Sequence, residues 1–141
     1  MLAVQLLRAQ GCKVLAADPS ARRREWAAGW GATVIAPGES WETAVEAATG
    51  GRGVDGVILA LATQSVEPVR EAARCCRRRG RIVLVGTARI ELPRDEFYRR
   101  ELRFEVSCSY GPGRYDASYE REGHDYPVGH VRWRAQRNIE A

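Results

Sequence analysis

The sequence has no apolar run that approaches the ~18 residues a membrane-spanning helix requires. Its first residues follow a helical pattern, without the basic region and cleavage site of a secretory signal peptide. These absences argue against a membrane partner, and we expect a cytoplasmic protein. At 141 residues, of which 45% are hydrophobic, the chain is long enough to bury a core as one domain.

Metal-binding patterns are missing as well. The four cysteines show no C-x-x-C spacing, and the two histidines lie far from them: Cys12, Cys75, Cys76 and Cys108 against His124 and His130. No zinc site can be assembled from this spacing, so we expect no zinc in this segment. Reduced, mostly buried thiols in a cytosolic protein are the simplest interpretation of these cysteines.

Lysine is nearly absent. Lys13 is the only one among 22 basic residues, and arginine supplies the rest of the positive charge. The formal net charge is +4, and the arginines are spread along the chain without the aromatic interleaving that would suggest base stacking. We interpret them as surface and helix-end charges, and we expect no specific nucleic-acid partner.

What the sequence does contain is an alternation of short extended and helical patterns. Extended segments are expected at 12–17, 33–36, 54–62, 81–86 and 102–108, with a shorter one at 90–92. Helices are expected at 1–10, 20–29, 40–49, 65–79 and 95–101, and from 133 to the chain end. This alternation predicts an α/β fold with a doubly wound parallel sheet. The nearly continuous apolar run at 54–62 predicts a strand covered on both faces.

A carboxylate stands where the first predicted strand ends. The segment 14–17 is followed by Asp18, and the turn pair Pro19-Ser20 precedes a helix. An acid at this point of a βαβ unit can accept hydrogen bonds from both hydroxyls of a ribose and would repel a phosphate. Alternatively, Asp18 only starts a turn and caps the next helix. Other residues at the carboxyl ends of predicted strands, where such sheets bind ligands, are 62–64 and 86–87.

Residues 1–111 resemble the nucleotide-binding domain of the medium-chain dehydrogenase/reductase superfamily, which includes the zinc-type alcohol dehydrogenases. The similar segments are AVQLLRAQGCKVLAADPS, WGATVI, VDGVILALAT and CRRRGRIVLVG. The tail GHDYPVGHVRWRAQRNIEA resembles a branch of these proteins that is fused to a second oxidoreductase domain. The resemblance implies a Rossmann-like fold that binds NAD, with NADP less favoured because of the acid.

The same resemblance implies particular cofactor-binding residues. Asp18 would hold the adenosine ribose beside Ser20, and Arg23 would lie over the adenine or near the ribose. Alternatively, Arg23 is only one exposed charge of the run 22–24. Such an arginine run could also bind the 2′-phosphate of NADP. The other residues would line the cleft near the nicotinamide, largely through backbone groups: Ala62, Thr63, Gly86 and Thr87.

The family's pattern is incomplete in this chain. Its first strand and its G-x-G-x-x-G loop would lie just before Met1, and its catalytic half and zinc ligands are missing. Ser107, Ser109 and His124 show no arrangement typical of a proton relay. We therefore expect a partial NAD(P)-binding domain at 1–111. Residues 112–141 would form a loop and the start of a helix that belong to the rest of a larger dehydrogenase.

The expected function is that of a cofactor-binding segment of an NAD(H)-dependent alcohol or sugar dehydrogenase, inactive as an isolated chain. Two alternatives stay open: a non-catalytic binding module with a nucleotide-binding fold, or another Rossmann-type enzyme such as a methyltransferase.

Without the first strand, segments 14–17 and 57–61 lose the neighbour between them. We expect them to pair directly, to leave a slot, or to borrow a strand from another copy in a homo-oligomer.

Overall fold

The computed structural model of the chain describes residues 1–108, 110–127, 129–131 and 133–140. In chain order its elements are α1 (Leu2–Ala9), β1 (Leu15–Ala16), α2 (Ala21–Gly29), β2 (Thr33–Val34), α3 (Trp41–Thr49), β3 (Val54–Leu59), β4 (Ala62–Thr63), α4 (Glu67–Cys75), β5 (Cys76–Leu84), β6 (Thr87–Ala88), α5 (Arg94–Arg100), β7 (Arg103–Val106), α6 (Ala117–Glu122) and α7 (Ala135–Glu140). All strand pairings among these residues are parallel, which confirms the predicted α/β class.

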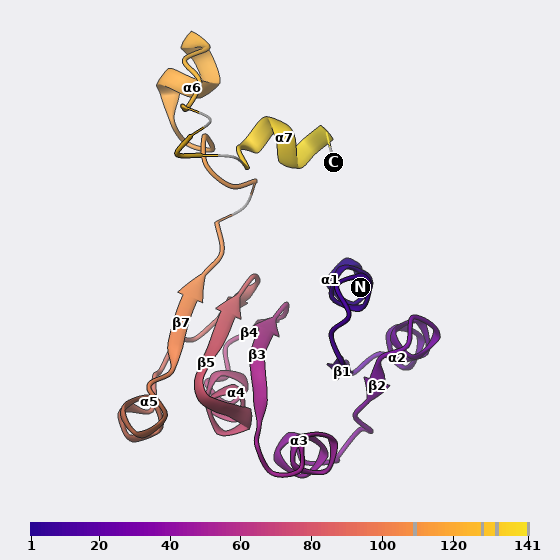
Figure 1. Cartoon of the computed structure of the whole chain (residues 1–141). Coiled ribbons are helices and arrows are strands. Elements are labelled where there is room, and N and C mark those ends of the chain that lie inside the picture. Colours follow the sequence, from indigo (N-terminus) through magenta and orange to yellow (C-terminus); the bar gives the residue numbers. More distant parts are fainter. Residues whose placement is uncertain (109, 128, 132, 141) are drawn as a thin grey trace.

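The strands form three separate sheets (Figure 1). The main sheet has the order β3-β5-β7, and the short pair β4-β6 follows the carboxyl ends of its first two strands. The N-terminal sheet contains only β1 and β2, with Leu15 opposite Thr33. Within the described residues β1 and β3 do not pair with each other, so the structure leaves the two sheets apart, as one of the three expected outcomes proposed.

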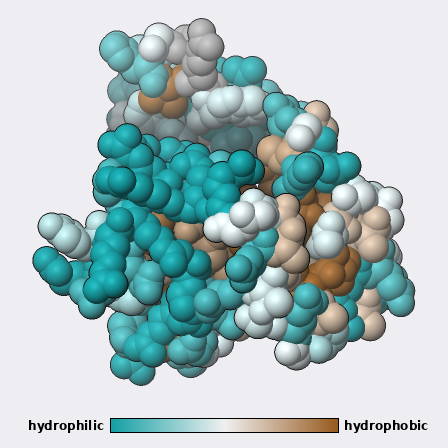
Figure 2. All heavy atoms as spheres, turned by 60° about the horizontal axis from the view of Figure 1, so that its bottom comes forward, coloured by the Kyte–Doolittle hydropathy of each residue, from teal (hydrophilic) through white to brown (hydrophobic). Residues whose placement is uncertain are grey.

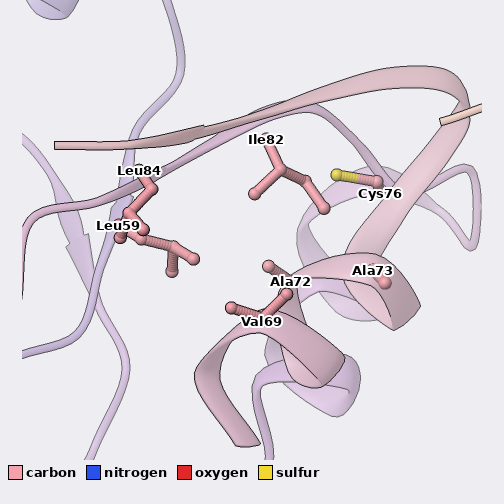
Figure 3. Packing of buried hydrophobic residues seen from close by; sticks show 7 residues of the cluster. All are labelled: Leu59, Val69, Ala72, Ala73, Cys76, Ile82 and Leu84. Carbon is pink, nitrogen blue, oxygen red and sulfur yellow. The ribbon is translucent and has the colours of Figure 1, made fainter. Parts of the chain in front are cut away.

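The hydrophobic core lies between α4 and the main sheet (Figure 3). The helix contributes Val69, Ala72 and Ala73, which the 3.6-residue period of α4 brings to one side. The sheet contributes Cys76 and a set of aliphatic side chains, and no member of the cluster is more than 3% exposed: Leu59, Ile82 and Leu84. Full burial of one such aliphatic side chain contributes about 1.5–3 kcal/mol. The helical spacing of Val69, Ala72, Ala73 and Cys76 predicts one inner stripe, and all four residues are buried, but Cys76 belongs to β5 and not to the helix.

The main sheet is covered on one face only among the described residues, contrary to the prediction for the apolar run 54–62. Along β5, Ile82 and Leu84 are buried against α4, whereas Arg81, between the buried Gly80 and Ile82, is exposed. On β3, Leu59 is buried but its neighbour Ile58 is 43% exposed. Because successive side chains of a strand point to opposite faces, the apolar residues of this run are divided between a packed and an open face.

The helix predicted at 65–79 ends earlier, at Cys75, and the next residue already begins β5. Arg100 from α5 stabilises this end, since its Nη1 donates to the carbonyl oxygens of Ala73 (3.2 Å), Arg74 (2.5 Å) and Cys76 (3.0 Å). The last carbonyl groups of a helix have no backbone N–H donor within the helix, so a side chain can take that place. A side chain distant in sequence thus ends the helix, which local periodicity does not reveal.

A β-bulge interrupts the pairing of β5 with β3 immediately after this junction, where four residues of β5 stand opposite a single residue of β3. Val54 pairs with Cys76, but Gly56 pairs with Arg81, so the segment 77–80 has no register partner on β3. Arg79 adopts a left-handed conformation in this bulge, with φ of 60°. Gly53 is required on the opposite side, because a Cβ there would lie 2.7 Å from the backbone nitrogen of Arg77.

Smaller differences follow from the same tertiary packing. The extended segment 54–62 is divided between β3 and β4, and the strand predicted at 90–92 is replaced by β6 at Thr87–Ala88. The predicted C-terminal loop contains α6, whose first turn is capped by the side chain of Asp116. α7 begins two residues later than predicted, and residue 141, its predicted end, lies outside the described residues. The segment with α6 and α7 stands away from the sheets in Figure 1. No described helix is long and apolar enough to cross a membrane.

Candidate functional site

Asp18 lies in the turn that follows β1 and begins α2. Its Oδ1 accepts a hydrogen bond from the backbone nitrogen of Ser20 at 2.8 Å, which closes an Asx-type turn. Ser20 is the N-cap residue of α2, as predicted, but its own side chain makes no capping bond. The Asp18 side chain is 26% exposed. The structure thus shows Asp18 in its turn-forming role through Oδ1. The second carboxylate oxygen, Oδ2, lies toward Arg23.

Two consecutive arginines hold this turn in different ways. Arg23 Nη1 lies 3.6 Å from Asp18 Oδ2, and its side chain is 60% exposed. Arg24 Nη1 instead donates to the main-chain oxygens of Asp18 at 2.7 Å and of Pro19 at 2.9 Å. Sequence reasoning singled out Arg23 and missed Arg24; the only signal was the arginine run itself. The two arginines add positive charge beside a carboxylate that would meet a polar ligand.

The second group of predicted residues comes together at the carboxyl ends of β3 and β5. Ala62 pairs with Thr87 across β4 and β6, and the backbone nitrogen of Thr87 donates to Leu61 at 2.8 Å. The backbone nitrogen of Gly86 donates to Leu59 at 3.2 Å. Thr63 is half-buried, and its Oγ1 accepts from the nitrogen of Ser65 at 3.1 Å. Parallel strand pairing therefore assembles this edge, as the sequence predicted.

The two groups do not share a sheet. Asp18, Ser20 and Arg23 follow the N-terminal sheet. The second group, which contains Thr63 and Thr87, follows the main sheet. A hollow of about 530 Å³ lies elsewhere, between α6 and α7, and is lined by Tyr110 and Tyr119 among others. Sequence reasoning gave no indication of this hollow, because it depends on the packing of two short helices that the loop-like composition conceals.

The predicted absence of a proton relay is only partly covered by the structure. Ser109 lies outside the described residues, and Ser107 contributes its backbone nitrogen to Leu84 at 2.9 Å. His124 has one partner that sequence spacing did not suggest, since its Nδ1 lies 2.9 Å from Ser118 Oγ. Both side chains are exposed, far from the two predicted groups in sequence.

Among the described residues, no group of three or more histidine, cysteine, aspartate or glutamate side chains is placed to hold a metal ion. Of the four cysteines, Cys75 and Cys76 are buried, while Cys12 and Cys108 are exposed. Burial raises the pKa of the Cys75 and Cys76 thiols to about 11. They are therefore protonated thiols at physiological pH.

Parallel strands that alternate with helices, and an acid at the end of the first strand, define this chain as a Rossmann-like α/β protein. The sequence profile of the zinc-binding dehydrogenases matches residues 1–121. The chain belongs to this family. Family membership places the chain among relatives of dehydrogenases rather than of methyltransferases.

Solved structures of zinc-type dehydrogenases share the fold. An alcohol dehydrogenase from the archaeon Aeropyrum pernix is 28% identical, with a TM-score of 0.66 over 74% of this chain and 31% of that chain. An alcohol dehydrogenase from Thermus sp. ATN1 is 26% identical, with a TM-score of 0.63 over 75% and 32%. A 2R,3R-butanediol dehydrogenase from Bacillus subtilis covers 91% of this chain and 38% of its own, with a TM-score of 0.68; at 19% identity it supports the fold alone.

The chain therefore spans about a third of the length of these dehydrogenases. No curated protein matches it in sequence. The residues present fit one part of a dinucleotide, since a carboxylate at a strand end suits ribose hydroxyls. They do not fit the zinc of the family's name, because neither the described cysteines nor the described histidines gather in one place.

Proposed function

We propose that this chain is the cofactor-binding segment of an NAD(H)-dependent alcohol or sugar dehydrogenase and holds the adenosine half of the cofactor. The observation that supports this function is Asp18, a half-buried carboxylate in the turn after β1. One of its oxygens is used by the turn, and the other lies toward Arg23 on the surface, where a ribose hydroxyl can donate to it.

The proposal assigns the remaining predicted residues as follows. Arg23, which is largely exposed, contacts the adenine or the ribose, and Ser20 continues the turn around it. Thr63, Gly86 and Thr87 offer backbone groups and hydroxyls to the nicotinamide side of the cleft. Because they follow another sheet, we expect that binding of a whole dinucleotide brings the two groups together.

The proposed reaction is hydride transfer between a hydroxyl group of the substrate and the nicotinamide ring, chemistry that the bound cofactor supplies. The chain's own residues bind and orient the cofactor, and Asp18 accepts hydrogen bonds from the ribose hydroxyls in this role. We further propose that the isolated chain is inactive, that its partner is the catalytic part of a longer dehydrogenase, and that it acts in the cytoplasm. The buried thiols of Cys75 and Cys76, which form no disulfide, support a reducing compartment.

Ligand-observed nuclear magnetic resonance on the full chain tests cofactor binding directly. Saturation transfer from the protein to NAD should be strongest at the adenine and ribose protons, and Asp18→Asn should abolish most of it while it preserves the shape of the turn. Asp95→Asn removes an exposed carboxylate from the first turn of α5 and serves as the control. If NAD shows no transfer, or if both variants lose it equally, the assignment of Asp18 is wrong.

A further inference from the structure

Six arginines gather where the strands of the main sheet begin, at the end opposite to Thr63 and Thr87. We call this set, together with its three carboxylates, the arginine edge: Arg52, Arg77, Arg78, Arg79, Arg81 and Arg103 with Asp55, Glu101 and Glu105. Six positive and three negative charges leave +3 here, out of +4 for the whole chain. In Figure 2, which turns the lower side of Figure 1 forward, hydrophilic residues dominate on the side of α5 and β7.

The guanidinium groups of this edge already hold carboxylates. Arg78 donates to Glu101 Oε1 through Nε at 3.1 Å and through Nη2, while Arg79 Nε donates to Oε2 at 2.8 Å. Arg77 Nε donates to Asp55 at 2.6 Å. Planar forks directed at carboxylate oxygens are the geometry that arginine uses to recognise this group.

The positive charge exceeds what these internal pairs can neutralise. One carboxylate, Glu101, is shared by Arg78 and Arg79, whose side chains are both 73% exposed. Arg103 lies opposite Arg81 on the next strand and faces the same exposed side of the sheet. Arg78 and Arg79 belong to the bulge 77–80, whose residues have no register partner on β3.

We propose that the arginine edge docks an acidic segment of a partner protein. The complement of a surface with a net charge of +3 is a run of aspartate and glutamate side chains, which the exposed guanidinium groups bind as they bind Glu101. No aromatic residue belongs to the set, so it offers no platform for stacked nucleic-acid bases. The partner leaves Ala62, Thr63, Gly86 and Thr87 free, because these predicted cofactor residues follow the opposite ends of the same strands, and the other three follow the N-terminal sheet. This inference does not depend on the proposed function.

Fluorescence anisotropy of the full chain with a labelled decapeptide of glutamate and alanine tests the proposal. Binding should occur at low ionic strength and weaken toward about 0.15 M salt, where the Debye length falls to about 8 Å. The double variant Arg78→Gln/Arg79→Gln should weaken it about tenfold. Arg121→Gln/Arg137→Gln has the same net charge but alters two exposed arginines of the C-terminal segment, and it should bind as the parent chain does.

The single variant Arg103→Gln provides a second measurement that leaves the ion pairs of the bulge intact, and it should weaken binding in the same direction. The proposal is overturned if the parent chain does not bind the peptide at low salt, or if the control variant loses as much affinity as the double variant. Tighter binding of a double-stranded oligonucleotide than of the peptide would also overturn it, in favour of a nucleic-acid partner.

Discussion

A Cβ atom on Gly86 would lie 1.9 Å from the carbonyl oxygen of Leu61. No two non-bonded heavy atoms approach so closely, so the chains after β3 and β5 can run side by side only because residue 86 has no side chain. The contact draws Thr87 against Leu61 and allows the short β4-β6 pair to form. One glycine therefore determines the shape of the edge where the nicotinamide half of the cofactor is expected.

The first prediction follows from this contact. Gly86→Ala should lower the free energy of unfolding by about 1–3 kcal/mol, the usual cost of forcing extra volume into a packed site. The matched control is Gly29→Ala in α2, where a Cβ meets no atom within 4 Å. That variant should gain stability, because alanine is favoured over glycine in helices by about 0.5–1 kcal/mol. Urea unfolding of both variants gives the comparison, and equal midpoints would contradict it.

The second prediction concerns the choice of cofactor. In a version of the chain extended by a strand and a G-x-G-x-x-G loop, NAD should bind more tightly than NADP, because Asp18 would repel the 2′-phosphate. Asp18→Ala should narrow that preference. Titration of both cofactors by calorimetry measures it, and tighter binding of NADP by the unchanged chain would show the assignment to be wrong.

The third prediction concerns metals. Purified chain that has been washed with a chelator should contain no stoichiometric zinc, because its cysteines and histidines lack ligand spacing. Mass spectrometry of the metal content, normalised to protein concentration, is the measurement. One zinc ion per chain would require a ligand set that neither the sequence pattern nor the described side chains indicate.

The fourth prediction concerns pH. Burial raises the pKa of the Cys75 and Cys76 thiols from 9.0 to about 11. Between these values the unfolded chain loses protons that the folded chain retains, so the free energy of unfolding should fall as pH rises from 9 to 11. Below pH 9 this contribution is fully present. Cys76→Ala should show a shallower fall than the parent chain in denaturant titrations at several pH values; identical slopes would refute the role of burial.

The fifth prediction concerns the separation of β1 from β3. Each strand leaves one edge without a strand partner among the described residues, and an unpaired buried backbone group costs about 1–3 kcal/mol. A chain extended by a strand that fits between them should therefore melt at a higher temperature than the 141-residue chain. Calorimetry with sedimentation measures stability and oligomeric state together. If the shorter chain is monomeric and melts as high, the two edges need no partner.

Much of this fold could be predicted because its signals are local. The alternation of turn residues with apolar runs predicted the order of the longer elements through β7, although it did not divide 54–62 into β3 and β4 and placed a strand at 90–92 instead of β6. The spacing of Val69, Ala72 and Ala73 predicted the buried face of α4. Predictions were wrong where a distant residue decides the outcome. Arg100 ends α4 from another helix, and only tertiary packing shows that Ile58 lies on an uncovered face.

The candidate site likewise contains contacts that the sequence predicts and contacts that it does not. Parallel pairing brought Ala62 and Thr87 together, a consequence of strand ends that sequence order predicts. The grip of Arg24 on the backbone of Asp18 and Pro19 could not be predicted, since three arginines in a row look alike until the helix fixes their directions. Whether the seven predicted residues bind NAD stays a prediction.

The bulge in β5 also bears on how this sequence can change in length. Because residues 77–80 stand outside the register between Val54 and Gly56, an insertion there lengthens a protruding loop and leaves every later strand pair in place. An insertion after Arg81 would exchange the faces of Ile82 and Leu84 and turn the core outward. This strand therefore tolerates an insertion best in the segment 77–80, which carries the exposed side chains of Arg78 and Arg79.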